Sequence, residues 1–172
     1  CRTDDIFRIA SQTKAVSVVA LMTLFEEGLF QLDEPIKKYL PEFANPEVLV
    51  SYDARTGRTV TRPAKRDITI RHLITHTSGI CYDGVFDELL QKQGVAAHKT
   101  LDELTLRENV SRIARVPLRH DPGDDFTYSY NIDVLGALAE VLTGESFEKL
   151  VAGRVLDPLG MNDTYFHLPA DK

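Results

Sequence analysis

Residues 4–33, DDIFRIASQTKAVSVVALMTLFEEGLFQLD, contain a run without any charged residue, from Ala15 to Phe25, closed by Gly28 as a helix stop. The length of the run favours a helix over a strand. A helix that is apolar on nearly every side is expected to be buried on nearly every side. The run is too short, and too closely flanked by charges, to span a membrane. We therefore predict that it forms the central helix of a globular core.

The first turn of this predicted helix carries a candidate catalytic pair. Ser11 and Lys14 are three residues apart, so their side chains share one helix face. Ser11 stands at the helix start, where unpaired N–H groups favour a developing oxyanion. Lys14 is the last charge before the apolar run, and a lysine that loses hydration at the edge of a core can act as a neutral base. A serine needs such a base beside it to become a nucleophile.

The same spacing occurs a second time, which makes spacing alone weak evidence. Ser146 and Lys149 are also three residues apart, but Ser146 follows a Thr-Gly-Glu turn and is predicted to cap a helix, with Lys149 on a solvated face. The alternative for Ser11 and Lys14 is similar: a helix-capping serine and a lysine whose stem lies along the surface. Local context leaves both interpretations open.

Composition excludes several classes of protein. The chain has 172 residues, the size of one domain, with 43% hydrophobic and 27% charged residues, as in soluble globular proteins. A net charge of −6 argues against nucleic-acid binding. The two cysteines and five histidines show no metal-ligand spacing, so no metal and no cofactor are expected. No P-loop, dinucleotide fingerprint or G-x-S-x-G motif occurs.

The rest of the chain is predicted to be mainly helical, with one hairpin and no internal repeat. The hairpin pairs Val48–Tyr52 with Arg58–Thr61 across a turn that ends at Gly57. Predicted helices cover residues 36–39, 71–76, 86–92, 101–116, 132–142 and 147–156.

Taken in order, several segments resemble the serine β-lactamase family in its broad sense, which includes class C β-lactamases, penicillin-binding peptidases and related esterases. The matching segments are FRIASQTK (7–14), EG with LD (27–33), IRHLITHTSG (70–79), PG with F and YS (122–129), DVLG (133–136) and PLGM (158–161). They run the whole length of the chain in the family's order. This ordered set favours the catalytic interpretation of Ser11 and Lys14.

The resemblance implies a role for each site residue. Ser11 would be the acylated nucleophile and Lys14 the group that takes its proton. Tyr128 matches the tyrosine of the family's Tyr-x-Asn motif, which relays protons, with Lys14 as the cation that lets it ionise. Without the resemblance, Tyr128 would be interpreted as a packing residue. Tyr130 stands where the motif has its asparagine and would be a substrate-binding residue, with Asn131 displaced by one position.

Two departures from the family pattern shape the expected function. The motif asparagine helps to hold a β-lactam side chain, so Tyr130 favours ester or peptide chemistry over β-lactam turnover. The family's Lys-Thr-Gly-like strand does not occur after Tyr128, nor do the sheet strands expected before Ser11. We therefore expect residues 1–172 to be one unit, mainly α, from a larger α+β domain of the β-lactamase and transpeptidase type.

The expected activity is a serine hydrolase that forms an acyl-enzyme with a small-molecule ester, amide or β-lactam. The alternatives are a penicillin-binding sensor that acylates without turnover, and an inert helical scaffold. Other polar residues are weaker candidates: His76 and His120 as acid–base groups, Asp124 with Asp125 as a cation site, and Cys81 as a small packing residue.

Overall fold

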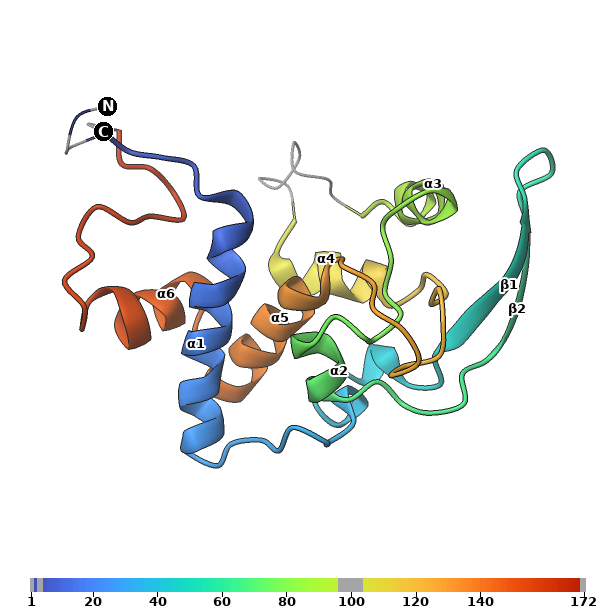
Figure 1. Ribbon diagram of the computed structural model, residues 1–172, viewed down its shortest axis with the longest axis horizontal. Coiled ribbons are helices and arrows are strands. Elements are labelled where there is room, and N and C mark those ends of the chain that lie inside the picture. Colours follow the sequence, from blue (N-terminus) through green and yellow to red (C-terminus); the bar gives the residue numbers. More distant parts are fainter. Residues whose placement is uncertain (1, 3–4, 96–103, 171–172) are drawn as a thin grey trace.

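The computed structural model describes residues 2, 5–95 and 104–170. It is mainly helical and carries one two-stranded sheet, as predicted (Figure 1). The α-helices are α1 (Thr13–Glu26), α2 (Ile70–Ile74), α3 (Val85–Lys92), α4 (Leu106–Ile113), α5 (Asn131–Thr143) and α6 (Phe147–Val151). Short 3-10 turns are η1 (Ala10–Gln12), η2 (Ile36–Lys38) and η3 (Pro41–Phe43), and the π-helical segment η5 (Ala152–Leu156) continues α6.

Each predicted helix has a counterpart in the structure, although two of the helices differ in extent from the prediction. Helix α2 ends at Ile74 rather than at residue 76, because His76 takes the left-handed conformation with a φ of 55°. Helix α4 is shorter than the predicted 101–116. It begins after Thr105, whose side chain and that of Glu108 cap each other's backbone N–H groups. Residues 101–103 of that prediction lie outside the described residues.

The predicted hairpin is confirmed and projects from the helical body (Figure 1). Strands β1 (Glu47–Asp53) and β2 (Arg58–Pro63) pair antiparallel, with a register shift between Leu49 and Ser51. Two backbone hydrogen bonds join the first residues of β1 to Leu118, which precedes Tyr128 in the sequence. The backbone N–H of Leu49 donates to the Leu118 carbonyl at 2.8 Å, and that of Leu118 donates to the Glu47 carbonyl at 2.7 Å.

The helix at the centre of the core is α5, not α1. Helix α5 packs against α1, α2, α4 and α6, and residues 134–139 are all buried (Figure 1). Gly136 lets two neighbours approach, since a Cβ there would lie 3.0 Å from Leu106 and 3.2 Å from Phe147. These residues belong to α4 and α6, so the glycine sets the distance between three helices.

Helix α1 is buried on one face only, which corrects the prediction that it is covered on nearly every side. Its fully buried side chains are Ser17, Ala20, Leu21 and Leu24. On the opposite side, Val19 is 56% exposed. Within the described residues, nothing covers this apolar face, although its composition matches that of a core helix.

Candidate active site

Ser11 and Lys14 lie at the start of α1, as predicted. The chain turns at Ala10 with a φ of 45° and passes through η1, which contains Ser11, into the helix. One helical turn separates the two side chains, and the Lys14 ammonium donates a hydrogen bond to Ser11 Oγ at 3.3 Å. Ser11 is exposed, so a substrate carbonyl can reach its hydroxyl.

Tyr128 meets this pair from a distant part of the sequence. Its hydroxyl donates a hydrogen bond to Ser11 Oγ at 2.6 Å. Lys14 Nζ lies 4.8 Å from the centroid of the Tyr128 ring, which is cation–π distance. The structure therefore brings together the three residues predicted to be catalytic. Ser11 Oγ accepts hydrogen bonds from both the Tyr128 phenol and the Lys14 ammonium.

The electrostatic surroundings of Tyr128 favour its ionised form. Hydrogen bonding with the Lys14 ammonium, and next with Ser11, holds the pKa of Tyr128 below its usual value, against a smaller opposing effect of burial. A phenol with a lowered pKa is a better proton acceptor near neutral pH, because more of it is present as phenolate. The arrangement can thus take the proton from Ser11.

The loop that carries Tyr128 is held by backbone hydrogen bonds to residues 76–79. The N–H groups of Arg119, Gly123 and Thr127 donate to the carbonyls of Gly79, Thr77 and His76, at 2.8, 2.7 and 2.7 Å respectively. The two segments are in close contact at Gly79. A Cβ on this glycine would lie 2.4 Å from the His120 carbonyl oxygen, so no other residue fits without moving the loop.

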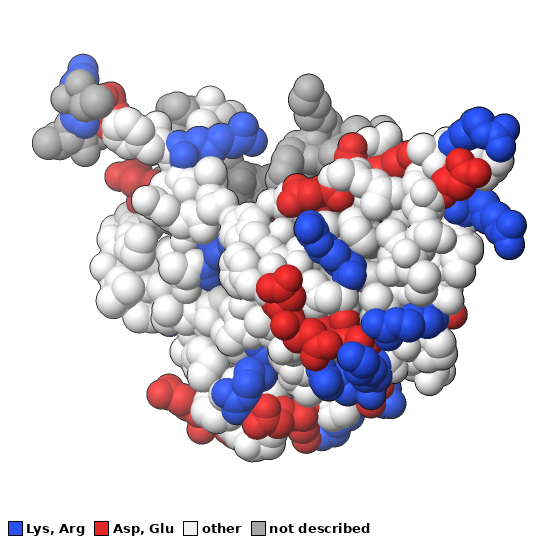
Figure 2. All heavy atoms as spheres, turned by 45° about the vertical axis from the view of Figure 1, so that its right-hand side comes forward, with Lys and Arg blue, Asp and Glu red and all other residues white. Residues whose placement is uncertain are grey.

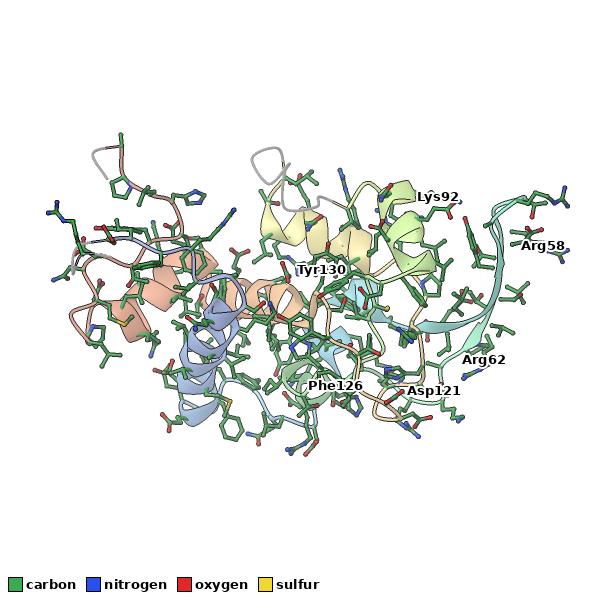
Figure 3. All side chains as sticks on the ribbon, turned by 45° about the horizontal axis from the view of Figure 1, so that its top comes forward. Arg58, Arg62, Lys92, Asp121, Phe126 and Tyr130 are labelled. Carbon is green, nitrogen blue, oxygen red and sulfur yellow. The ribbon has the colours of Figure 1, made fainter. Side chains whose placement is uncertain are left out.

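An ion pair with a buried carboxylate connects the same loop to the hairpin. Arg62 of β2 donates two hydrogen bonds to Asp121, at 2.9 and 2.7 Å (Figure 3), and the Lys65 backbone N–H donates a third at 2.8 Å. The Arg62 guanidinium, followed by the Lys65 N–H, holds the pKa of the Asp121 carboxyl well below its usual range. Asp124 pairs with Arg66 at 2.6 Å. On the side of the molecule that Figure 2 shows, acidic and basic side chains are intermixed.

Three residues near Tyr128 were not predicted to act together. The His76 ring stacks on the Tyr128 ring, with centroids 4.8 Å apart and planes at 28°. Asn131 Nδ2 lies 2.8 Å from His76 Nδ1, and Ser78 Oγ donates to Asn131 Oδ1 at 2.5 Å. The sequence signals were separate: His76 was a weaker acid–base candidate, Asn131 stood one position from the motif asparagine, and Ser78 lay in the matching segment 70–79 without a role.

Tyr130, predicted to bind substrate, faces other aromatic rings. It is half-buried at the N-terminal end of α5, and its ring meets the Tyr82 ring edge-on, with centroids 5.4 Å apart (Figure 3). Burial, and next the nearby Asp133 carboxylate, raise the pKa of the Tyr130 phenol. Tyr82 also meets Tyr128 edge-on at 6.3 Å, so Tyr82 connects Tyr130 to the candidate catalytic tyrosine.

The weaker candidates have structural partners. His120 lies 2.9 Å from both the Asp121 carbonyl and the Thr127 hydroxyl.

In the described part of the chain, no group of three or more histidine, cysteine or acidic side chains could hold a metal ion. Ser146 caps α6, where its side chain accepts from the Lys149 N–H, as predicted. None of the helices in the described ranges has the length and apolar character of a membrane span.

The chain is similar to known proteins along its whole length. The Beta-lactamase family model matches residues 1–172. Protein Rv1367c of Mycobacterium tuberculosis is 38% identical over 172 residues, which are 98% of this chain and 41% of that protein. Esterase EstB of Burkholderia gladioli is 36% identical over 176 residues, with 96% of this chain and 39% of EstB covered.

A solved structure with a similar fold is EstCE1, described as a hydrolase with promiscuous acyltransferase activity. It superposes with a TM-score of 0.72 at 32% identity, over 90% of this chain and 38% of EstCE1. The chain thus spans about two fifths of the length of these relatives. Sequence and fold lead to the same assignment: this chain belongs to the Beta-lactamase family.

Proposed function

We propose that the protein is a serine hydrolase that acts through an acyl-enzyme on Ser11. The observation that carries this proposal is the convergence of Tyr128 and Lys14 on Ser11 Oγ, at 2.6 and 3.3 Å. An exposed serine hydroxyl with a proton acceptor and a cation in contact is the arrangement that nucleophilic catalysis requires. The names of EstB and EstCE1 support the same class of chemistry.

In this mechanism Tyr128 takes the proton, because its oxygen makes the shorter of the two hydrogen bonds to Ser11 Oγ. The Ser11 O–H bond breaks as Oγ bonds to the substrate carbonyl carbon, and the proton passes to the Tyr128 phenolate. Lys14 remains an ammonium that stabilises the phenolate and the developing oxyanion. The leaving alkoxide then takes the proton from Tyr128. A water molecule then attacks the acyl carbon and gives its proton to Tyr128. Ser11 Oγ takes that proton back as the acid is released.

The proposed substrates are carboxylic esters, ahead of amides and β-lactams. Tyr130 occupies the position of the family's motif asparagine, and its ring faces Tyr82 instead of presenting an amide. An aromatic surface beside the nucleophile suits an apolar acyl or alkoxy group, which gains by leaving water. An alcohol could replace water as acceptor, as the description of EstCE1 suggests for that protein.

We also propose that residues 1–172 form one unit of a larger domain. The exposed apolar face of α1 and the greater length of the relatives support this proposal. The expected cover is the central sheet of the family fold. The test is the intact mass of the protein from its native source, since a mass that matches these 172 residues alone would overturn it.

The experiment for the proposed activity is intact-protein mass spectrometry before and after incubation with a fluorophosphonate probe. One adduct is expected in the parent protein and none in Ser11→Ala. Ser146→Ala is the matched control, because Ser146 has the same spacing to a lysine but caps α6, so this variant should label normally. An adduct that persists in Ser11→Ala would contradict the assignment of the nucleophile.

Turnover of p-nitrophenyl esters then separates hydrolysis from acylation alone. Repeated turnover that disappears in Ser11→Ala is expected. A single burst with a stable adduct would instead support a protein that binds covalently and does not release product.

A further inference from the structure

The imidazole of His76 lies directly against the proposed proton acceptor. Its ring stacks on Tyr128 at 4.8 Å, and the Phe126 ring meets it edge-on at 6.0 Å. The backbone of His76 is left-handed, with a φ of 55°, which is an uncommon conformation for a residue with a side chain. A conformation of this kind persists only where the surroundings determine it. The contacts of the ring are therefore expected to be specific.

Asn131 is the first of these contacts, and its amide has one orientation. The Ile80 N–H donates to Ser78 Oγ at 3.1 Å, so the Ser78 hydroxyl proton is available for Asn131 Oδ1 at 2.5 Å. On its other side, Asn131 Nδ2 lies 3.4 Å from the Thr127 carbonyl, which can only accept. Both contacts place the amide oxygen toward Ser78 and the nitrogen toward His76.

This orientation determines the protonation state of His76. Asn131 Nδ2 can only donate, and it lies 2.8 Å from His76 Nδ1, so Nδ1 must be the acceptor. The single ring proton is therefore on Nε2. A proton on Nδ1 would place two hydrogen-bond donors, His76 Nδ1–H and Asn131 Nδ2–H, against each other. Asn131 and its partner Ser78 are both 0% exposed. Because the Asn131 amide is buried, no water can relieve that clash, and we expect the imidazole to stay neutral.

Burial and the nearby Lys14 cation act on the ring in the same direction. Lys14 of α1 is the cation that acts on His76, Tyr128 lies on its face, and Tyr82 meets Tyr128 edge-on. Burial first, and the Lys14 ammonium second, lower the pKa of His76. A positive charge on His76 would repel Lys14 and change the charge that surrounds Tyr128.

We propose that His76 is a positioning residue for Tyr128, locked as the neutral Nε2–H tautomer by the buried Asn131–Ser78 pair, so that Lys14 and not the imidazole supplies the positive charge beside the phenol. The locking of the tautomer stands on geometry alone. The consequence for catalysis rests on the proposed function, in which Tyr128 accepts the Ser11 proton.

The first test is ¹⁵N NMR of the histidine side chains from about pH 5 to pH 8, the range in which an ordinary imidazole titrates. We expect His76 to keep an unprotonated Nδ1 and a protonated Nε2 throughout. His167, whose side chain is 83% exposed, provides the comparison signal of an exposed imidazole in the same spectra. A protonated Nδ1 on His76 anywhere in this pH range would overturn the proposal.

The second test is the variant Asn131→Asp, which replaces the donor with an acceptor of the same shape. The new carboxylate raises the pKa of His76, so an imidazolium should appear near neutral pH. Labelling by the fluorophosphonate should then change at least about threefold across the new pKa of His76, because the imidazolium adds a second positive charge beside Tyr128. A merely structural role would lower the rate equally at every pH, and that result would refute the positioning role.

Ser78→Ala provides a second variant should Asn131→Asp fail to fold. Without the Ser78 hydroxyl only the 3.4 Å contact with the Thr127 carbonyl still orients the Asn131 amide, so the amide should rotate more readily and NMR should show both His76 tautomers. A single unchanged tautomer would contradict the lock. If the parent protein gives no fluorophosphonate adduct while His76 behaves as expected, the proposed function fails and the tautomer assignment stands, so the two failures are distinguishable.

Discussion

Helices α1 and α5 are both rich in apolar residues, yet only α5 is enclosed. Four helices surround α5, whereas α1 buries one face and leaves Val19 exposed. Both helices contribute to the candidate site at their N-terminal ends: Ser11 and Lys14 at α1, Tyr128 and Asn131 at α5. The difference shows that an apolar sequence indicates a helix whose surface favours burial. Whether that surface is buried depends on which other segments pack against it.

The largest expected effect concerns the first turn of α1. Lys14→Ala removes the cation beside Tyr128, so the pKa of the phenol should return toward its usual value and labelling of Ser11 at pH 7 should fall about a thousandfold. Lys14→Arg keeps the charge but cannot act as a base, and should retain more activity than Lys14→Ala. Equal losses in the two variants would show that Lys14 is itself the proton acceptor. The measurement is the fluorophosphonate rate as a function of pH.

A second prediction contrasts a covered ion pair with an uncovered one. Arg62–Asp121 and Arg71–Asp33 share two-point geometry, but the carboxylate side chains are 2% and 75% exposed. Interaction with Arg62 lowers the folded-state pKa of Asp121, so its stabilisation is present above the unfolded value of about 4 and is lost as the pH falls below it.

Urea midpoints at pH 7 and at about pH 3 measure this effect. Asp121→Asn should flatten the pH dependence substantially, and Asp33→Asn only slightly because solvent screens that pair. A larger change for Asp33→Asn would contradict the importance of burial for the loop that carries Tyr128.

The smallest effects provide the most direct comparison of the two helices. Val134 of α5 is fully buried and Val19 of α1 is 56% exposed, and threonine has nearly the same shape as valine. Val134→Thr buries a hydroxyl and should reduce the free energy of unfolding by about 1–3 kcal/mol. Val19→Thr should change it by less than about 0.5 kcal/mol. Equal losses in urea unfolding would mean that the α1 face is covered in solution.

The sequence predicted which segments form helices and strands better than it predicted what packs around them. Helical periodicity and turn residues located each described α-helix and the hairpin, and Ser146 was identified as a cap from its neighbours. The central position of α5 could not be predicted, because it depends on contacts between segments far apart in the chain. The left-handed conformation at His76 was also missed, since a histidine gives no local signal for it.

The candidate site was predictable only through family resemblance. Ser11 and Lys14 share a helix turn, so their proximity follows from local spacing. Tyr128 reaches Ser11 across 117 residues, and no local pattern could place it there. The Ser78–Asn131–His76 contacts depend on the approach of two segments, so the sequence named His76 only as a weak acid–base candidate and could not connect it to Ser78 and Asn131.

The pairing of residues 76–79 with the loop before α5 has a consequence for engineering. Because main-chain atoms join the two segments, exposed side chains on them that have no role in the site can be exchanged while the phenol keeps its place. Gly79 cannot be exchanged, since the His120 carbonyl occupies the space of any side chain. A library that randomises the exposed position Asp125 while keeping His76, Ser78 and Gly79 fixed would therefore vary the surface next to Tyr128 without changing the backbone that holds it.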